Sequence, residues 1–148
     1  MKKIPGLVVI AVMAVACSSP APLTATVTAA ASTAETVGGA AQLVVNVTNT
    51  GPGIPHLGLV FRTHDVWFQT HQMTSLGGCT ISVSMSAFDC GDLAAGQAQS
   101  YSFSGAATSA GSFHYELAMR DLVQPFDYVN EHSDGPDVQA WDEQVTAA

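Results

Sequence analysis

The amino-acid sequence predicts an all-β sandwich of about seven to nine short strands. Apolar and polar residues alternate in several short runs, which is the pattern of strands with one buried face. Turn residues separate these runs at intervals of roughly 8–12 residues or slightly more, a spacing typical of sandwiches. No stretch has a convincing helical pattern, and no internal repeat is evident.

The N-terminal segment has the proportions of a secretory signal peptide, which we place at residues 1–16. Lys2 and Lys3 precede an uncharged apolar run over residues 4–16. This run is shorter than the roughly 20 residues that a membrane-spanning helix needs. We therefore expect the mature protein to lie outside the cytoplasm.

Cys17 stands where the apolar run stops, directly after the small residues Ala14-Val15-Ala16. Small residues before a cysteine resemble the bacterial lipobox, whose cysteine receives a diacylglycerol and becomes the mature N-terminus. Ala14 departs from the leucine preferred at that place, and the same three residues also form an A-x-A site for ordinary cleavage. We expect lipid attachment at Cys17, which would anchor the protein to a membrane, and secretion if cleavage is ordinary. Residues 17–22 would then be a lipidated tether and residues 23–148 the folded domain.

The charge of the chain excludes one class of partner. Four lysines and arginines stand against twelve aspartates and glutamates, and the net charge is −8. Both lysines lie in the leader, so Arg62 and Arg120 are the fixed cations of the mature chain. Nucleic acid and anionic lipid headgroups require cationic patches, so we expect neither as an electrostatic partner.

The three cysteines of the chain divide into two roles. Assigning Cys17 to lipid leaves Cys79 and Cys90, which can form a disulfide in an oxidising compartment. A two-cysteine metal site is the alternative, but the pair has no Cys-x-x-Cys spacing and no nearby histidine.

The first strands are predicted from the order of apolar residues. Residues 23–28 form a weak first strand, and residues 29–34 are expected to form a loop because this alanine-rich stretch is short. Residues 42–48 form a half-buried strand that ends in a turn over residues 49–53. The inward face of this strand is predicted to hold Leu43, Val45 and Val47.

The middle of the chain is predicted to contain two further extended runs, residues 57–60 and 66–70. After Gly77-Gly78, a strand follows whose return begins at residues 88–90. One face of that strand is predicted to hold Ile81, Val83 and Met85.

The last strands carry the clearest alternation. Residues 100–104 place Tyr101 and Phe103 inward. Residues 113–120 place four apolar side chains on one face: Phe113, Tyr115, Leu117 and Met119. Residues 121–137 are expected to form an acidic loop. Residues 138–146 form a last strand with Trp141 and Val145 on the same face.

Two motifs resemble a known family. Residues 37–53, VGGAAQLVVNVTNTGPG, resemble the opening of the bacterial conserved-repeat domain catalogued as domain of unknown function eleven. Cys79, Cys90 and the turn GDLAAG at residues 91–96 resemble its cysteine pair and following turn. The resemblance, over roughly residues 23–119, implies an immunoglobulin-like sandwich that serves surface proteins as a spacer or adhesive module. The chain departs from the family in its single copy and in the histidines and aromatic residues of residues 64–73.

Histidines supply one candidate metal site. His56, His64 and His71 lie within sixteen residues, and His114 lies farther along. Histidine ligands outside the cell could suit copper or zinc. On one continuous strand, however, His64 and His71 would face opposite sides, because their numbers differ by an odd value. Met85 and Met119 share parity with apolar residues and are expected to be packing residues.

The acidic tail supplies a candidate calcium site, because carboxylate oxygens are the ligands that calcium prefers. Its spacing matches no EF-hand loop, and a solvated acidic loop is the alternative. The candidate ligands are Asp127, Glu131, Asp134 and Asp137.

No motif indicates catalysis. The chain contains no G-x-S-x-G elbow, no H-E-x-x-H, no phosphate-binding glycine loop and no dinucleotide fingerprint. We therefore expect a protein that is not an enzyme and that carries no cofactor. Trp67, Phe68 and Trp141 either fill the core or form an exposed contact patch for a protein or a glycan.

These observations predict a cell-envelope lipoprotein whose sandwich serves in adhesion, scaffolding or ligand presentation. The alternative is an extracytoplasmic metal-binding protein that uses the histidines.

Overall fold

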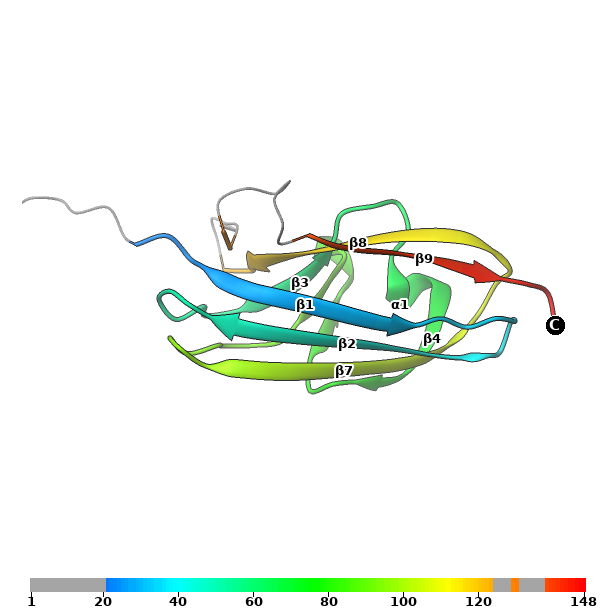
Figure 1. Cartoon of the computed structure of the whole chain (residues 1–148), viewed down its shortest axis with the longest axis horizontal. Helices are drawn as coiled ribbons and strands as arrows, with labels where there is room; N and C mark the ends of the chain where they lie inside the picture. Colours follow the sequence, from blue (N-terminus) through cyan, green and yellow to red (C-terminus); the bar gives the residue numbers. More distant parts are fainter. Residues whose placement is uncertain (1–20, 124–128, 131–137) are drawn as a thin grey trace, which may run out of the picture.

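Two antiparallel sheets pack against each other in the computed structural model, which describes residues 21–123, 129–130 and 138–148 (Figure 1). One sheet has four strands in the order β1-β2-β7-β4, and the other has five in the order β5-β6-β3-β8-β9. The predicted all-β sandwich is therefore confirmed. No helix among the described residues is both long enough and apolar enough to cross a bilayer.

The four-stranded sheet alternates between the core and solvent over most of β1, β2 and β7. Leu43, Val45 and Val47 of β2 are buried, as their spacing predicts, and so are Tyr101 and Phe103 of β7. The strands of this sheet are β1 (Ala25–Ser32), β2 (Ala40–Asn49), β7 (Ala98–Ala107) and β4 (His71–Leu76). Because successive side chains of a strand point to opposite faces, one face of the sheet packs against the core.

The five-stranded sheet provides the opposite wall of the core. Tyr115, Leu117 and Met119 of β8 are buried as predicted, and Phe113 at the open end of the strand is partly buried. The strands are β5 (Thr80–Ser82), β6 (Ala87–Asp89), β3 (Leu57–Phe61), β8 (Gly111–Asp121) and β9 (Gln139–Val145). The predicted last strand is present as β9, which pairs with β8.

The two sheets are joined along the side where β1 faces β9. Thr36 and Thr146 form a parallel bridge, and the Ala29 N–H donates a hydrogen bond of 3.1 Å to Gln139 Oε1. Between the sheets, Phe61 lies at the centre of an aromatic cluster. Its ring is 5.8–6.3 Å from four others, each met edge to face: Phe68, Phe88, Tyr115 and Trp141. Trp67 is buried, and Phe68 and Trp141 are partly buried against the core. Of the two alternatives for these aromatic residues, core packing is therefore the one observed.

The predicted extended run at residues 57–60 is present as β3, but the run at residues 66–70 and the second half of the strand predicted after Gly78 are wrong, because the chain forms helical turns there. Trp67–Thr70 is a short helix, α1, in which the Thr70 N–H donates to the Val66 carbonyl at 3.2 Å. This turn carries the chain from β3 in one sheet to β4 in the other. Val83–Met85 is a 3₁₀ turn, η1, followed by Ser86 in the left-handed region at φ 51°. Val83 is 69 % exposed there, so Ile81, Val83 and Met85 do not share one face of a strand as predicted.

The predicted loop at residues 29–34 is also wrong over most of its length. Strand β1 continues to Ser32, and Ala31 pairs with Leu43 of β2. The alanines have weak strand propensity, but the neighbouring β2 supplies hydrogen-bonding partners that local sequence does not reveal.

Cys79 and Cys90 form the predicted disulfide, with an S–S distance of 2.03 Å. They stand directly outside the first pair of the β5–β6 ladder, Thr80 and Asp89. The bond therefore closes the base of a short hairpin whose ladder has three residue pairs.

Removing this disulfide should lower the free energy of unfolding. The cysteines are 11 residues apart, and closing a loop of that length stabilises a fold by about 3 kcal/mol in the chain-entropy model. We expect a Cys79→Ala/Cys90→Ala variant to lose up to that amount in urea denaturation. Dithiothreitol should destabilise the natural chain and leave the variant unchanged. An equal effect of the reductant on both proteins would contradict this role of the bond.

Candidate functional site

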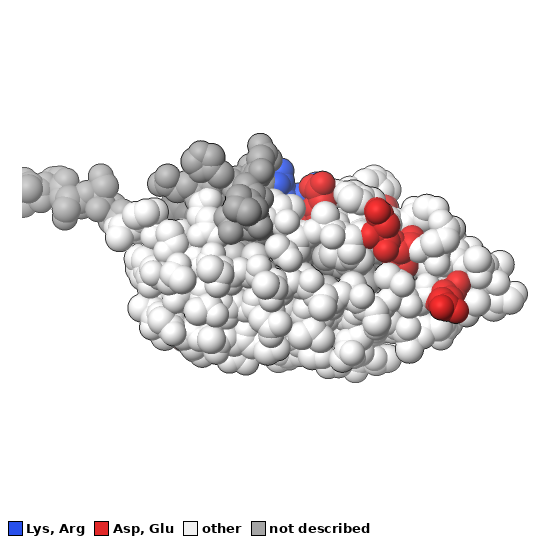
Figure 2. Space-filling model, viewed as in Figure 1, with Lys and Arg blue, Asp and Glu red and all other residues white. Residues whose placement is uncertain are grey.

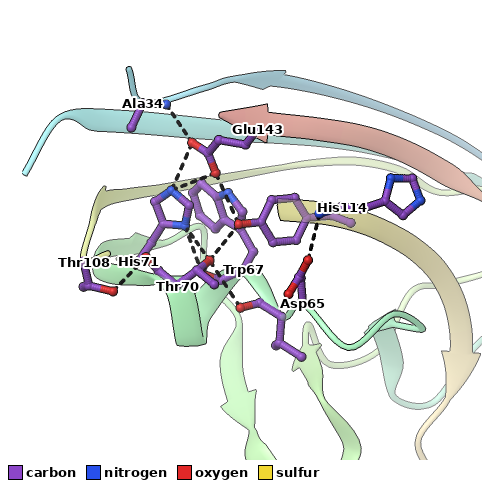
Figure 3. Close-up of polar contacts among 10 residues, drawn as sticks. Ala34, Asp65, Trp67, Thr70, His71, Thr108, His114 and Glu143 are labelled. Carbon is purple, nitrogen blue, oxygen red and sulfur yellow. Dashed lines mark hydrogen bonds and ion pairs between the residues drawn. The ribbon is translucent and has the colours of Figure 1, made fainter. Parts of the chain in front are cut away.

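A fully buried pair of polar side chains connects the two sheets. Glu143 lies on β9 and His71 begins β4, and both side chains are 0 % exposed (Figure 3). The distance between His71 Nε2 and Glu143 Oε2 is 3.2 Å. Because β9 and β4 belong to different sheets, this contact crosses the interior of the sandwich.

The helical turn α1 fixes the position of the His71 ring. The ring stacks on Trp67 at a centroid distance of 4.5 Å, and His71 Nδ1 is 3.1 Å from the Trp67 carbonyl oxygen. Thr70 Oγ1 lies 3.0 Å from His71 Nδ1 and 2.8 Å from the Tyr115 hydroxyl. Two consecutive residues of one turn therefore enter the same polar cluster.

Three donors surround the carboxyl group of Glu143. The Ala34 N–H donates to Oε1 at 2.7 Å, and the Tyr115 hydroxyl donates to Oε2 at 3.2 Å. His71 Nε2 supplies the third contact. We name this set the buried cluster: Ala34, Thr70, His71, Tyr115 and Glu143. Buried carboxylates persist in proteins when several donors satisfy them in this way.

The roles of the His71 ring nitrogens depend on which of them carries a proton. Nδ1 lies 3.1 Å from the Trp67 carbonyl oxygen, which can only accept, and 3.0 Å from the Thr70 hydroxyl, which can donate or accept. Nε2 lies 3.2–3.3 Å from the Glu143 carboxyl oxygens. The Thr70 hydroxyl can donate to the Tyr115 oxygen or to the Trp67 carbonyl, which is 3.1 Å away. Each polar side chain of the buried cluster therefore has a hydrogen-bonding partner.

Burial raises the pKa of the Tyr115 hydroxyl well above its ordinary value of 10.0, and the nearby Glu143 charge acts in the same direction. The hydrogen bond with Thr70 opposes this shift in part. Tyr115 is therefore protonated at physiological pH and remains a donor to Glu143.

The buried cluster places a hydroxyl, an imidazole and a carboxylate in sequence, which is the order of groups in a nucleophilic relay. Its surroundings favour a structural role. A substrate cannot reach His71 or Glu143 in this conformation, because both side chains are 0 % exposed. The backbone of Thr70 is also held in place, because its carbonyl accepts hydrogen bonds from the Thr108 N–H and hydroxyl, both at 2.9 Å.

A second polar group lies on the surface over β8 and β9. His114 and Asp142 are paired in the ladder, and His114 Nδ1 is 2.6 Å from Asp142 Oδ1. The backbone N–H of His114 donates to Asp65 Oδ2 at 2.8 Å. These residues line a shallow pocket of about 320 Å³. Hydrogen bonds with Asp142 and then Glu116 raise the pKa of His114 above its ordinary value.

The structure separates the histidines of the predicted metal site. His56 lies 3.4 Å from Asp89, and His71 is enclosed in the buried cluster. The His64 ring lies 3.4 Å from Asp65, whereas His114 meets Asp65 only through its backbone N–H. Across residues 21–123, 129–130 and 138–148, no three histidine, cysteine or carboxylate side chains are grouped to hold a metal ion.

Two further predicted sites fall on residues outside the described part of the chain. They are the lipid-attachment residue Cys17 and the candidate calcium ligands Asp127, Glu131, Asp134 and Asp137. Sequence analysis also missed Glu143. A signal was present, because Glu143 shares the inward face of the last predicted strand with Trp141 and Val145. A carboxylate on an apolar face requires a buried partner.

Comparison with known proteins supports the fold. No family model matches this chain, and no curated protein matches it. Among solved structures, the CARDB domain of a Pyrococcus furiosus protein, determined in complex with di-metal ions, is similar with a TM-score of 0.51. The match covers 87 % of this chain and 93 % of that chain at 16 % identity. At this identity the likeness shows the fold alone, an immunoglobulin-like β-sandwich.

Neutralising Glu143 should destabilise the fold far more than neutralising its neighbour Asp142. Removing the carboxyl group of Glu143 leaves its three buried contacts without their acceptor, and breaking such a buried network costs about 3 kcal/mol or more. We expect Glu143→Gln to lower the free energy of unfolding by this amount in urea denaturation. Asp142→Asn, whose side chain is 83 % exposed, should cost less than about 1 kcal/mol. Equal losses would show that the His71–Glu143 contact contributes no more to the free energy of unfolding than the exposed Asp142 side chain does.

NMR titration should show a raised pKa for His114. Asp142→Asn should bring this pKa down further than Glu116→Gln, because the Asp142 hydrogen bond is the larger cause. By linkage, the stabilisation from this pair is complete below the unfolded pKa of about 6.5 and is lost as pH rises through the folded pKa. A His114 pKa that neither substitution changes would rule out this pairing in solution.

Proposed function

We propose that this chain is a non-enzymatic lipoprotein of the cell envelope whose immunoglobulin-like sandwich serves in adhesion, scaffolding or ligand presentation. The buried cluster is the observation that supports the non-enzymatic part of this proposal. Its histidine, carboxylate and hydroxyl groups are occupied in joining the two sheets, and His71 and Glu143 are enclosed. Such a domain offers a stable surface to a partner, and its function depends on what that surface contacts.

The two motifs that resemble the conserved-repeat domain are in contact through Asn49, which supports a shared architecture. Asn49 belongs to the VTNTGP segment and is 1 % exposed. Its side-chain amide donates to the Leu93 and Ala94 carbonyls of the GDLAAG turn, both at 3.1 Å, and to the Pro52 carbonyl at 2.7 Å. One side chain therefore holds both turns. In that family the sandwich is expected to act as a spacer or adhesive module.

Membrane attachment through Cys17 is part of this proposal and can be tested directly. Cells expressing the natural chain should incorporate radiolabelled palmitate into it, because a lipobox cysteine receives acyl chains. Cys17→Ser should abolish the label, whereas a Cys79→Ala/Cys90→Ala variant should retain it. The Cys17→Ser protein should also move from the membrane fraction to the soluble extracytoplasmic fraction. A Cys17→Ser protein that stays labelled would exclude this anchor.

Metal binding is the alternative proposal. The similar Pyrococcus furiosus domain, according to its description, binds di-metal ions. Zinc or copper retained by the purified protein in elemental analysis would favour this alternative over a purely adhesive module.

A further inference from the structure

The outer face of the four-stranded sheet carries no charged side chain. Strands β1, β2, β7 and β4 contain no aspartate, glutamate, lysine or arginine. The charged residues of the other described strands all lie in the five-stranded sheet: Asp89, Glu116, Arg120, Asp121, Asp142 and Glu143. Figure 2 shows this separation as a white surface over β1, β2 and β7, with charged residues along the β8–β9 border.

We name the outward side chains of these four strands the neutral face. Thr28, Asn46 and Ser100 form one row across β1, β2 and β7, and a parallel row contains Ser32, Gln42 and Ser104. Hydroxyl and amide groups thus recur about every 4.8 Å across the strands, and the two rows lie four residues, about 13 Å, apart along them. The row between them contains Ala30, Val44 and Ser102. The hydroxyl and amide groups both donate and accept hydrogen bonds.

The neutral face is unusual for the chain that bears it. A soluble domain commonly has charges on about 25–35 % of its surface residues. Here a chain of net charge −8 has kept one broad face free of them. A charged partner gains no Coulomb attraction at this face, and buried contact with it would desolvate that partner's charges without compensation. A neutral, hydrogen-bonding partner suits the face best.

A second copy of this chain suits the neutral face less well. The four strands hold 8, 10, 10 and 6 residues and make a surface of roughly 540 Å², whereas a stable protein interface needs about 800 Å² from each partner. Stable interfaces also depend on buried aromatic or arginine anchors. On these four strands, the aromatic residues Tyr101 and Phe103 point into the core.

We propose that the neutral face binds an uncharged polysaccharide. A polysaccharide chain presents hydroxyl groups that both donate and accept, which matches the chemistry of the Thr, Ser, Asn and Gln rows. Its repeating units can contact several rows at once, so that many weak contacts sum to a useful affinity. This inference rests on the proposed adhesive function and supplies the class of its partner.

Cosedimentation with insoluble cellulose and insoluble chitin tests the proposal. The natural chain, with its disulfide intact, should sediment with at least one of these polymers, and the bound fraction should not fall as salt is raised. Asn46→Glu places a charge at the centre of the neutral face and should weaken binding by about tenfold or more. Gln144→Glu adds the same charge to the exposed side of β9, on the other sheet, and should bind like the natural chain.

Further measurements separate the outcomes. Thr28→Glu on β1 should also weaken binding, and unchanged urea midpoints will show that both variants fold. Failure to bind either polymer, or equal binding by Asn46→Glu and the natural chain, overturns the proposal. A dimer in sedimentation velocity that Asn46→Glu disrupts would overturn it in favour of self-association. Palmitate labelling does not depend on this face, so a negative result here leaves the envelope lipoprotein intact.

Discussion

The contact between His71 and Glu143 is the constraint on which the interior of this sandwich depends. The apolar side chains of two sheets can slide past one another, because hydrophobic burial has no direction. A carboxylate that requires three donors from Ala34, Tyr115 and His71 permits one arrangement of β4, β8 and β9. The helical turn α1 is part of the same constraint, since it presents both Thr70 and His71 to the cluster.

A second constraint acts at the turns that follow β2 and precede β7. Asn49 closes the turn after β2 and holds the turn before β7, so one buried amide fixes two loops. The Cys79–Cys90 disulfide closes the β5–β6 hairpin at its base. These polar and covalent connections let a core that is rich in small alanine and valine side chains adopt a defined geometry.

The two sheets divide the surface between them. The charged residues of the described strands and the His114–Asp142 pair all lie in the five-stranded sheet, whereas the strands of the four-stranded sheet contain only neutral side chains. The acidic side supports solubility, and it repels other anionic molecules. The neutral face is free of that repulsion, which is why we place the partner there and assign the buried cluster to stability.

The sequence by itself determined the strands whose alternation is long and regular. Tyr101 and Phe103 in β7 and the inward residues of β2 and β8 follow directly from the two-residue period, and the cysteine count predicted the disulfide. Only the tertiary structure decided the helical turns at α1 and η1, the extension of β1, and the pairing of His71 with Glu143. These features depend on partners that are distant in sequence: 72 residues separate His71 from Glu143. Local periodicity shows which side chains turn inward, but it does not show which of them meet.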